Sequence, residues 1–197
     1  MTRNEILDAA AQIFSQKGYH GTSMQDIALA VNLQKASIYH HVSSKQEILF
    51  DLLNRGLDIL ISRVEEAIDD PGPPDEQLRK ATCAYLCTLT EYQDLASVLL
   101  LEYRSLEPDY HKRHIPQRDR FEQIWRELIQ EGVDVGNFTC DHPSLSARAL
   151  LGVLNWTVTW FRADGPMSAE DIANQLSDLF LMGLTTRDNN LETGWKL

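Results

Sequence analysis

A short polar run early in the chain carries the side chains best suited to bind an anion. It reads NLQKASIYHHVSSKQEIL, over residues 32–49, and it includes Lys35, Tyr39, His40 and Lys45. Each of these can donate a hydrogen bond, and such donors contact phosphate oxygens and base edges in nucleic acids. Taken alone, the run is also consistent with a solvated turn, so the neighbouring elements must decide between the two interpretations.

Two predicted helices precede this run. In the first, apolar residues repeat at spacings of three and four from Ile6 to Phe14, and Gly18 ends the helix. Ser23 stands at the capping position of the second helix, which spans about residues 24–31. The free backbone N–H groups at the start of this second helix favour a phosphate.

The polar run supplies a third helix, predicted over about residues 34–41. Asn32 precedes it and tolerates the left-handed backbone of a tight turn. Two short helices joined by a turn of about four residues make a helix-turn-helix unit, whose second helix fits a DNA major groove about 12 Å wide. On periodicity alone, the alternative is a helical hairpin with a solvated polar face. The side chains left outward on the second helix are Gln34, Lys35, Ser37, Tyr39 and His40.

A fourth helix follows, and charge divides the chain close to where this helix begins. The helix is predicted to run for roughly 24 residues and to end near Ile68. The net charge of −11 falls wholly on residues 51–197, because residues 1–50 hold four basic and four acidic side chains. This asymmetry indicates that the two parts of the chain differ in purpose, and we predict one domain over residues 1–46 and a second over residues 47–197.

Composition narrows the class of protein. The chain has 197 residues, of which 43% are hydrophobic and 24% charged, as is typical of a folded globular protein. No run of about 18 apolar residues occurs, so no membrane-spanning helix is expected. The first residues, MTRNEILDAAAQIF, lack the apolar core and cleavage site of a signal peptide, and we expect a cytoplasmic location.

No catalytic pattern is present in the sequence. It contains no nucleophile motif, no paired carboxylates in an apolar context and no phosphate-binding glycine loop, so an enzyme is not expected. Cys83 and Cys87 share a helix face and are interpreted as free thiols, and His111 and His114 lack further ligands. We therefore expect no metal site and no cofactor. A helical adaptor for a protein partner is the remaining alternative, and salt-dependent binding to duplex DNA would distinguish it from a DNA-binding protein.

Two longer motifs occur in the N-terminal part of the chain, which we call the head, over residues 3–53. They read IL.AA..IF...GY..TSM.DIA and SIYHHV.SK.EIL. Together they resemble the DNA-binding segment of the tetracycline-repressor (TetR-type) family of bacterial transcription regulators. Asn32 stands where this family usually has glycine, and Val42 where it usually has phenylalanine. Neither departure undermines the fold.

The resemblance implies an all-α fold of about nine helices, with an N-terminal three-helix helix-turn-helix domain and a larger helical ligand-binding and dimerisation domain. It implies a homodimeric repressor that binds a palindromic operator in double-stranded DNA and is released by a small-molecule effector. It implies that Thr22, Tyr39 and Lys45 contact phosphates. It implies that bases are read or approached by Gln34, Lys35, Ala36, Ser37 and His40. The predicted DNA contacts are Thr22, Ser23, Gln34, Lys35, Ala36, Ser37, Tyr39, His40 and Lys45.

Later helices, which would form the body, are predicted near residues 75–91, 95–105, 109–131, 143–162 and 168–184. Pro116 is expected to kink or split the third of these, and the final TTRDNNLETGWKL is expected to be frayed. Aromatic and apolar side chains from these helices can line a small-molecule cavity, although each one alone is also typical of a core. The predicted ligand-binding residues are Leu99, Tyr103, Phe121, Trp125, Asn155, Trp156 and Trp160.

Two polar features of the body bear on the effector. Asn155 lies among apolar neighbours, as a hydrogen-bonding anchor for a ligand or as an exposed or interface residue. The cluster HKRHIPQRDR, residues 111–120, is a site for an anionic head group or a solvated face. The stretch NWTVTWFRADGPMSAEDIANQLSDLFLMGL also weakly resembles a branch of the TetR-type family that responds to acyl-CoA thioesters. An acyl-CoA is therefore one candidate effector, and a hydrophobic drug-like compound is the alternative.

The last two helices, over residues 143–184, predict a dimer interface. Their apolar stripe is too strong for a lone terminal helix. In the family that the head resembles, the corresponding helices pack against their symmetry mates as a four-helix bundle. The predicted interface residues are Leu154, Phe161, Ile172, Leu176, Leu179 and Phe180.

Overall fold

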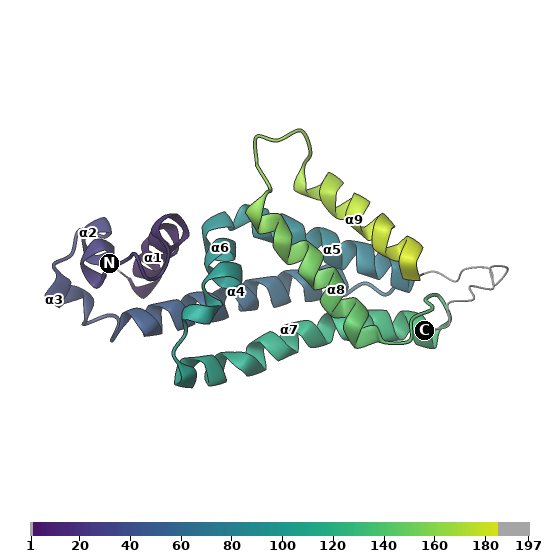
Figure 1. The fold of residues 1–197 in the computed structure, drawn as a ribbon, viewed down its shortest axis with the longest axis horizontal. Helices are drawn as coiled ribbons and strands as arrows, with labels where there is room; N and C mark the ends of the chain where they lie inside the picture. The colour runs from purple at the N-terminus through teal and green to yellow at the C-terminus, as the bar shows by residue number, and fades with distance from the viewer. Residues whose placement is uncertain (1, 185–197) are drawn as a thin grey trace, which may run out of the picture.

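The computed structural model describes residues 2–184, and all regular secondary structure in that range is helical (Figure 1). These residues form nine α-helices and two 3₁₀ turns, which confirms the predicted all-α class. No helix among them is both long enough and apolar enough to cross a membrane. The segment expected to be frayed, residues 185–197, lies outside the described residues. In chain order the elements are α1 (Arg3–Lys17), α2 (Met24–Ala30), α3 (Lys35–Ile38), α4 (Lys45–Ala67), α5 (Pro74–Glu91), α6 (Gln93–Leu101), η1 (Tyr103–Ser105), α7 (Pro108–Asp134), α8 (Pro143–Trp156), η2 (Thr157–Thr159) and α9 (Ala169–Leu184).

Most helices begin where the sequence supplies a cap or a proline. The side chains of Thr2, Ser23 and Ser44 accept hydrogen bonds from the first turns of α1, α2 and α4. Proline occupies the first position of α5, α7 and α8, where its missing N–H costs no helical hydrogen bond. Because these signals are local, the helix starts expected from the sequence agree closely with those observed.

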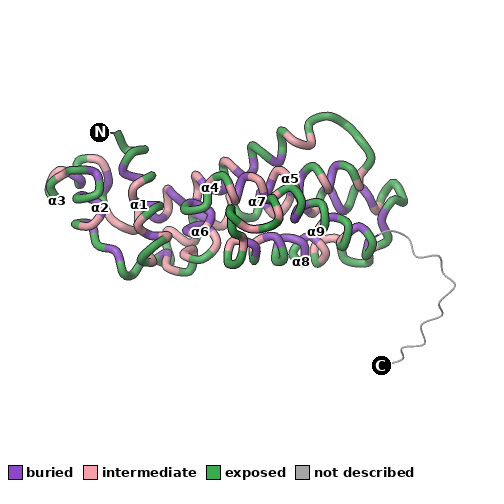
Figure 2. Tube along the Cα trace, turned by 90° about the horizontal axis from the view of Figure 1, so that it is seen from above, coloured by how far each residue is buried: buried purple, intermediate pink, exposed green. Residues whose placement is uncertain are grey.

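The molecule is elongated, with a head of α1–α3 at one end and a body formed by the remaining helices (Figure 2). α4 runs from the head into the body, and its apolar side chains are buried from Ile48 to Val64. α5 and α7 pack on α4, α8 packs on α7, and α9 packs on α5. Gly56 of α4 lies under α6, where an added Cβ would stand 3.2 Å from Cδ2 of Leu99. The missing side chain therefore lets these two helices approach each other closely.

Several predicted segments differ from the structure in length. α3 ends at Ile38 and is followed by turn residues, so the third helix is half as long as expected. The segment predicted over residues 95–105 is divided into α6 and η1. α7 continues through Pro116, whose ring is exposed to solvent, and this proline does not split the helix. α8 ends at Trp156, and its chain direction changes through η2.

Candidate functional site

α2 and α3 form the predicted helix-turn-helix unit, and local hydrogen bonds fix its geometry. In a reciprocal capping box, the Asp26 N–H donates to Ser23 Oγ at 3.2 Å and the Ser23 N–H donates to Asp26 Oδ2 at 2.8 Å. Asn32 takes the left-handed conformation in the turn, with a φ of 55°, as predicted. Ile27 and Ile38 are fully buried beneath the unit. The head therefore presents α3 on a packed support.

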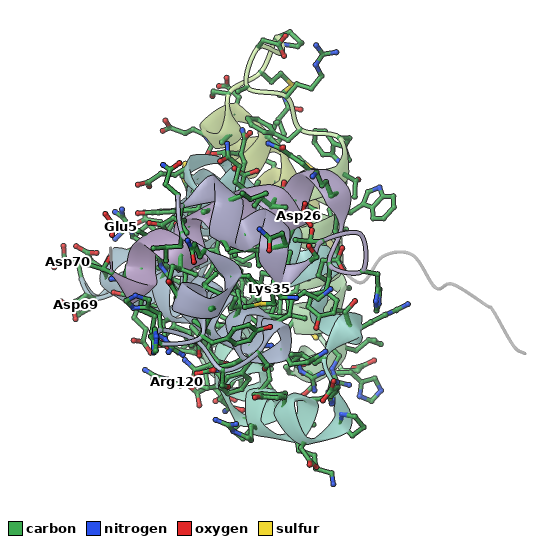
Figure 3. All side chains as sticks on the ribbon, turned by 90° about the vertical axis from the view of Figure 1, so that its left-hand side faces the viewer. Glu5, Asp26, Lys35, Asp69, Asp70 and Arg120 are labelled. Atoms are coloured by element: carbon green, nitrogen blue, oxygen red, sulfur yellow. The ribbon has the colours of Figure 1, made fainter. Side chains whose placement is uncertain are left out.

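The outer side of α3 is open to solvent, at the end of the molecule that Figure 3 views. Within residues 2–50, Lys35 is the one lysine or arginine that makes neither an ion pair nor a hydrogen bond to the protein. Its charge is therefore free for an anionic partner. Ser37 is half-buried, and the exposed predicted contacts on this side are Gln34, Lys35, Ala36, Tyr39 and His40.

Two residues predicted to contact phosphate, Thr22 and Lys45, are engaged inside the head. Thr22 is buried, and its hydroxyl donates to the carbonyl of Gly18 at 2.9 Å. The Lys45 ammonium donates to the carbonyls of Tyr19 and Thr22 at 2.8 and 2.6 Å and lies 4.2 Å from the centre of the Tyr19 ring. Burial lowers the pKa of Lys45, and the nearby Glu102 opposes this shift. Both residues thus hold the loop before α2, and one N–H of the Lys45 ammonium remains for a phosphate.

Arg3 fastens α1 to the first turns of α4. Its guanidinium donates to the carboxylates of Glu47 and Asp51 and, at 2.7 Å, to the carbonyl of His41. The hydrogen bond from Arg3, together with those from Ser43, lowers the pKa of Glu47 to about 2. The start of α4 is therefore part of the head as well as of the body, and the expected domain boundary falls inside a continuous helix.

A cavity of about 310 Å³ lies in the body and is walled by α4, α5, α6, η1, α7 and α8. Its lining is mostly apolar with a few polar groups, and its size suits a small molecule. The lining residues are Leu57, Leu60, Tyr85, Leu99, Leu100, Tyr103, His114, Arg118, Phe121, Glu122, Arg148, Leu151, Gly152 and Asn155.

Two polar side chains from different helices meet at this cavity. The Tyr85 hydroxyl of α5 donates to Oδ1 of Asn155 on α8. The Tyr85 ring is 1% exposed, stacks on Phe121 with ring centroids 5.6 Å apart, and meets Trp125 edge-on at 5.7 Å. Burial raises the pKa of Tyr85, so its phenol keeps the proton that it donates. Aromatic packing therefore fixes the hydroxyl, and the hydroxyl in turn holds the amide of Asn155.

Three arginines from different elements adjoin the cavity. Arg118 and Arg148 line it, and Arg104 donates from Nε to the hydroxyl of Tyr103, another lining residue, at 3.1 Å. Arg148 also donates to Glu122 at 2.8 Å, which links α8 to α7. All three arginines are exposed. Arg118 is ion-paired with Asp119 at 3.1 Å, so Arg118 and Arg148 each share their charge with one carboxylate, and the guanidinium N–H groups left over on the three arginines suit an anionic group.

His114 closes the cavity on the side of α4. It is 4% exposed, and its Nδ1 lies 2.9 Å from Oδ1 of Asn54. Burial lowers the pKa of His114 to about 4, and Arg118 and His111 act in the same direction, so the ring is neutral near pH 7. Among the described residues, no group of three or more His, Cys, Asp or Glu side chains is placed to hold a metal ion.

The connection between α6 and α7 joins the cavity to the head. Tyr103 of this connection lines the cavity. The adjacent Glu102 accepts a hydrogen bond at Oε1 from the Tyr19 N–H of the head at 3.1 Å. Gln46 of α4 makes two further hydrogen bonds to the connection, one of them from Nε2 to the carbonyl of Ser105 at 2.8 Å. This connection therefore contacts both the cavity and the groups that hold the head in place.

The structure places three predicted ligand-binding residues away from the cavity. Trp125 is fully buried behind the lining, while Trp156 and Trp160 are 66% and 49% exposed. Because successive residues of a helix differ by about 100° in direction, Asn155 faces the cavity while its neighbour Trp156 faces solvent. The four predicted residues that line the cavity are Leu99, Tyr103, Phe121 and Asn155.

Other lining residues were missed by the sequence analysis. His114 and Arg118 belong to the basic cluster of residues 111–120, and Tyr85 and Leu100 lie on the helices predicted near residues 75–91 and 95–105. The rest carry no local signal, because leucines of α4 and isolated charges on α7 and α8 are typical of any amphipathic helix. The lining residues with no such signal are Leu57, Leu60, Glu122, Arg148, Leu151 and Gly152.

α8 and α9 each carry an exposed apolar side. Gly152 of α8 and Gly183 of α9 are open as well, with no atom within 4 Å of an added Cβ. Large apolar side chains exposed along one side of a helix are typical of a protein interface. The exposed apolar residues are Leu145 (64%), Val153 (40%), Trp156 (66%), Leu179 (65%) and Met182 (73%).

Only part of the expected dimer interface lies on these exposed sides. Leu154 and Ile172 are 0% and 8% exposed within the single chain, so they belong to its own core. Leu179 is exposed. The strongest apolar stripe of each helix faces the chain's own core, which is why periodicity alone selected core positions. The remaining predicted interface residues, all half-buried, are Phe161, Leu176 and Phe180.

Two family models match the chain, one in the head and one in the body. The model described as "Bacterial regulatory proteins, tetR family" matches residues 6–52. The model described as "Tetracyclin repressor-like, C-terminal domain" matches residues 71–184. The two matches together include the helix-turn-helix unit, the exposed sides of α8 and α9, and all of the cavity lining except Leu57 and Leu60.

Similar proteins extend over nearly the whole chain. The HTH-type transcriptional repressor KstR2 of Mycobacterium tuberculosis is 26% identical over 185 residues, which cover 93% of this chain and 92% of KstR2. The structure of the TetR family transcriptional regulator PfmR from Thermus thermophilus has a TM-score of 0.83 and 39% identity, covering 90% of this chain and 97% of PfmR. AibR, solved in complex with isovaleryl coenzyme A and operator DNA, has a TM-score of 0.84 and 28% identity, covering 90% of this chain and 96% of AibR.

Proposed function

Because this chain belongs to the TetR family of bacterial regulatory proteins, we propose that it is a transcriptional repressor whose DNA binding is controlled by a small molecule. Membership confirms the expectation of a helix-turn-helix transcription regulator rather than an enzyme. The repressor KstR2, which is similar over almost its full length, supports the choice of repressor over activator.

DNA recognition is assigned to the exposed side of α3. Lys35 is a free cation there, and Gln34 and His40 beside it are open for base edges or phosphates. We propose that two heads act together on a palindromic operator, since dimers of helix-turn-helix proteins read two half-sites about one helical turn apart. The exposed apolar sides of α8 and α9 support a homodimer, because a second copy of the chain would cover them.

The observation that carries the effector proposal is an apolar cavity with three adjoining arginines. This combination suits a ligand with an apolar part and an anionic part, and an acyl-CoA thioester has both. AibR, a structural neighbour of this chain, is seen with isovaleryl coenzyme A and operator DNA. We therefore propose an acyl-CoA thioester as the effector.

Control of DNA binding is assigned to the connection between α6 and α7. Tyr103 lines the cavity, whereas Glu102 and Ser105 are hydrogen-bonded to the head and to the start of α4. A ligand that moves Tyr103 would change the position of the head. It shifts the equilibrium only to the extent that it binds the DNA-incompetent arrangement more tightly than the DNA-competent one.

The test begins with selection of operator DNA from a random pool. Release of the complex is then titrated with acyl-CoAs of increasing chain length and with free CoA. Each buried CH₂ contributes about 0.8 kcal/mol, so longer chains are expected to act at lower concentration until the cavity is full, and free CoA is expected to do little. A double variant, Arg118→Ala with Arg148→Ala, is expected to need more acyl-CoA for release. If acyl-CoAs of every length leave the complex intact while a cationic drug-like compound dissociates it, the effector proposal is wrong and the alternative effector class is favoured.

A further inference from the structure

Asn155 offers the cavity an amide N–H₂ group that the protein itself does not use. Its Oδ1 accepts the hydrogen bond of the Tyr85 hydroxyl, whereas its Nδ2 has no hydrogen-bond partner among the described residues. Asn155 lines the cavity, and the nearest lining residue along α8, Gly152, has no side chain to cover it. The amide therefore stands as an open donor beside apolar surface.

The orientation of this amide follows from the burial of Tyr85. A phenol has one proton to donate, and a buried donor without an acceptor is costly. Asn155 Oδ1 is the acceptor that the structure provides, so the oxygen of the amide must face Tyr85 and the nitrogen must face away from it. The stacking of Tyr85 on Phe121 and its edge contact with Trp125 keep the phenol in place.

We propose that Asn155 determines specificity by donating a hydrogen bond to a carbonyl oxygen of the ligand, and that Tyr85 is the residue that positions it. This inference rests on the proposed function and names the chemical group of the ligand that the cavity recognises, a carbonyl. The apolar members of the lining include Leu151, one turn before Asn155 on α8, and Leu60 and Leu99 from α4 and α6, which give the cavity an apolar surface. A ligand oxygen buried there without a donor would be penalised, so an open N–H₂ selects ligands that place a carbonyl at this point.

An acyl-CoA can supply such a carbonyl from two parts of the molecule. One is the thioester group, and the other is an amide of the pantetheine arm. Both are neutral acceptors of similar geometry, so the structure recognises their shared chemistry. Two pairs of probes distinguish the sources: octanoyl-CoA with S-octyl-CoA, which lacks the thioester carbonyl, and 2-decanone with 1-decene, which contain no CoA.

Calorimetric titration of the full-length protein with these four probes tests the proposal. The wild type is expected to bind 2-decanone about tenfold more tightly than 1-decene, as expected for one net hydrogen bond. Asn155→Leu should abolish this preference. Asn155→Asp, which keeps the shape and the acceptor for Tyr85 but removes the donor, should abolish it as well. Tyr85→Phe keeps the aromatic packing and should reduce the preference, because the amide is then free to turn.

The CoA pair identifies the source of the carbonyl. If it is the thioester, the wild type prefers octanoyl-CoA about tenfold over S-octyl-CoA, and Asn155→Leu loses that preference. If it is a pantetheine amide, the wild type binds both equally, and Asn155→Leu weakens both by a similar factor. Asn174→Leu, at an exposed position of α9, is the matched control and should leave all four affinities unchanged.

Two results overturn the proposal. One is equal affinity of wild type and Asn155→Leu for all four probes, with thermal unfolding showing that both are folded. The other is a wild type that does not distinguish 2-decanone from 1-decene and binds neither CoA compound more tightly than Asn155→Leu does. Failure of the effector proposal has a different signature: neither CoA compound binds the wild type, while 2-decanone is still preferred over 1-decene and that preference still depends on Asn155.

Discussion

Lys35 and Lys45 lie ten residues apart, and they differ in burial and in hydrogen bonding. The Lys35 side chain is exposed on α3 and free of internal partners. The Lys45 ammonium is half-buried and donates to the carbonyls of Tyr19 and Thr22. Lys35 is thus available to a partner without any change in the chain, whereas Lys45 also holds the loop that precedes α2.

Alanine variants of these two lysines should therefore differ in stability as well as in DNA binding. Lys35→Ala should weaken operator binding by about 1–3 kcal/mol and change sequence preference, with no change in thermal unfolding. Lys45→Ala should weaken binding to all sequences about equally and reduce the salt slope by about one. It should also lower the unfolding temperature, because two carbonyls lose their donor. Fluorescence anisotropy at several salt concentrations and thermal unfolding measure these effects. A Lys45→Ala protein with unchanged affinity and salt slope would remove Lys45 from the DNA-binding surface.

His114 makes stability depend on pH. Its pKa is lowered from 6.5 to about 4 in the folded chain, chiefly by burial. Between these values the unfolded chain binds a proton that the folded chain does not, so the free energy of unfolding falls as the pH is lowered from about 6.5 toward 4. One such group contributes at most about 1.4 kcal/mol per pH unit. His114→Gln, whose amide can still bond to Asn54, should show a shallower decline in urea unfolding over this range. Identical pH profiles for the two proteins would contradict this assignment.

Among the elements, the connection between α6 and α7 contacts both the ligand cavity and the DNA-binding head. It combines a cavity residue, Tyr103, with two residues bonded to the head or to α4, Glu102 and Ser105. α4 meets it through Gln46, within the first turn of a helix that begins in the head. The proposed coupling between ligand and DNA therefore runs through a few hydrogen bonds that can be removed singly.

Gln46→Ala removes both hydrogen bonds that α4 makes to this connection. We expect operator affinity without ligand to change by less than about 1 kcal/mol, since partly exposed hydrogen bonds of this kind contribute little. The ratio of operator affinities with and without a saturating effector should fall by several-fold, because that ratio measures the coupling. Gln123→Ala is the matched control, since Gln123 bonds only within α7, to Glu127. If both variants keep the full ratio, coupling runs through other contacts.

At the scale of the whole molecule, the charge distribution and the elongated shape both favour an approach to DNA through the head. The acidic body carries the net charge of −11, and the head that holds α3 is neutral. DNA should therefore be approached head first, because the body is repelled by phosphates. The head lies at one end of an elongated molecule (Figure 1). In the proposed dimer, association of the two bodies would hold the two heads together for two half-sites.

A charge on the exposed side of α9 should separate the dimer without unfolding the chain. Leu179 is 65% exposed in the single chain, so Leu179→Glu disturbs little within it. In a dimer the carboxylate would be buried without a partner, at a cost of several kcal/mol. Sedimentation should show monomers and operator affinity should be lost. Leu101→Glu, at a 55% exposed position of α6, should remain dimeric. A Leu179→Glu protein that is still dimeric would place the interface elsewhere.

The sequence alone determined where most helices begin and which side chains the head exposes on α3. Caps at Thr2, Ser23 and Ser44, prolines at helix starts and the left-handed turn at Asn32 depend on residues within a few positions of each other, so they can be read without the fold. The exposed side of α3 follows from Ile38, the one side chain that anchors that short helix in the core.

Only the tertiary structure decided which side chains meet. The Tyr85 to Asn155 bond, the inward turn of Lys45 and the exclusion of Trp156 from the cavity depend on how each helix is rotated about its axis. That rotation is set by packing against helices far away in the chain, which no local pattern records. For the same reason, periodicity selected Leu154 for the interface, whereas packing buries it in the chain's own core and leaves Leu179 outside.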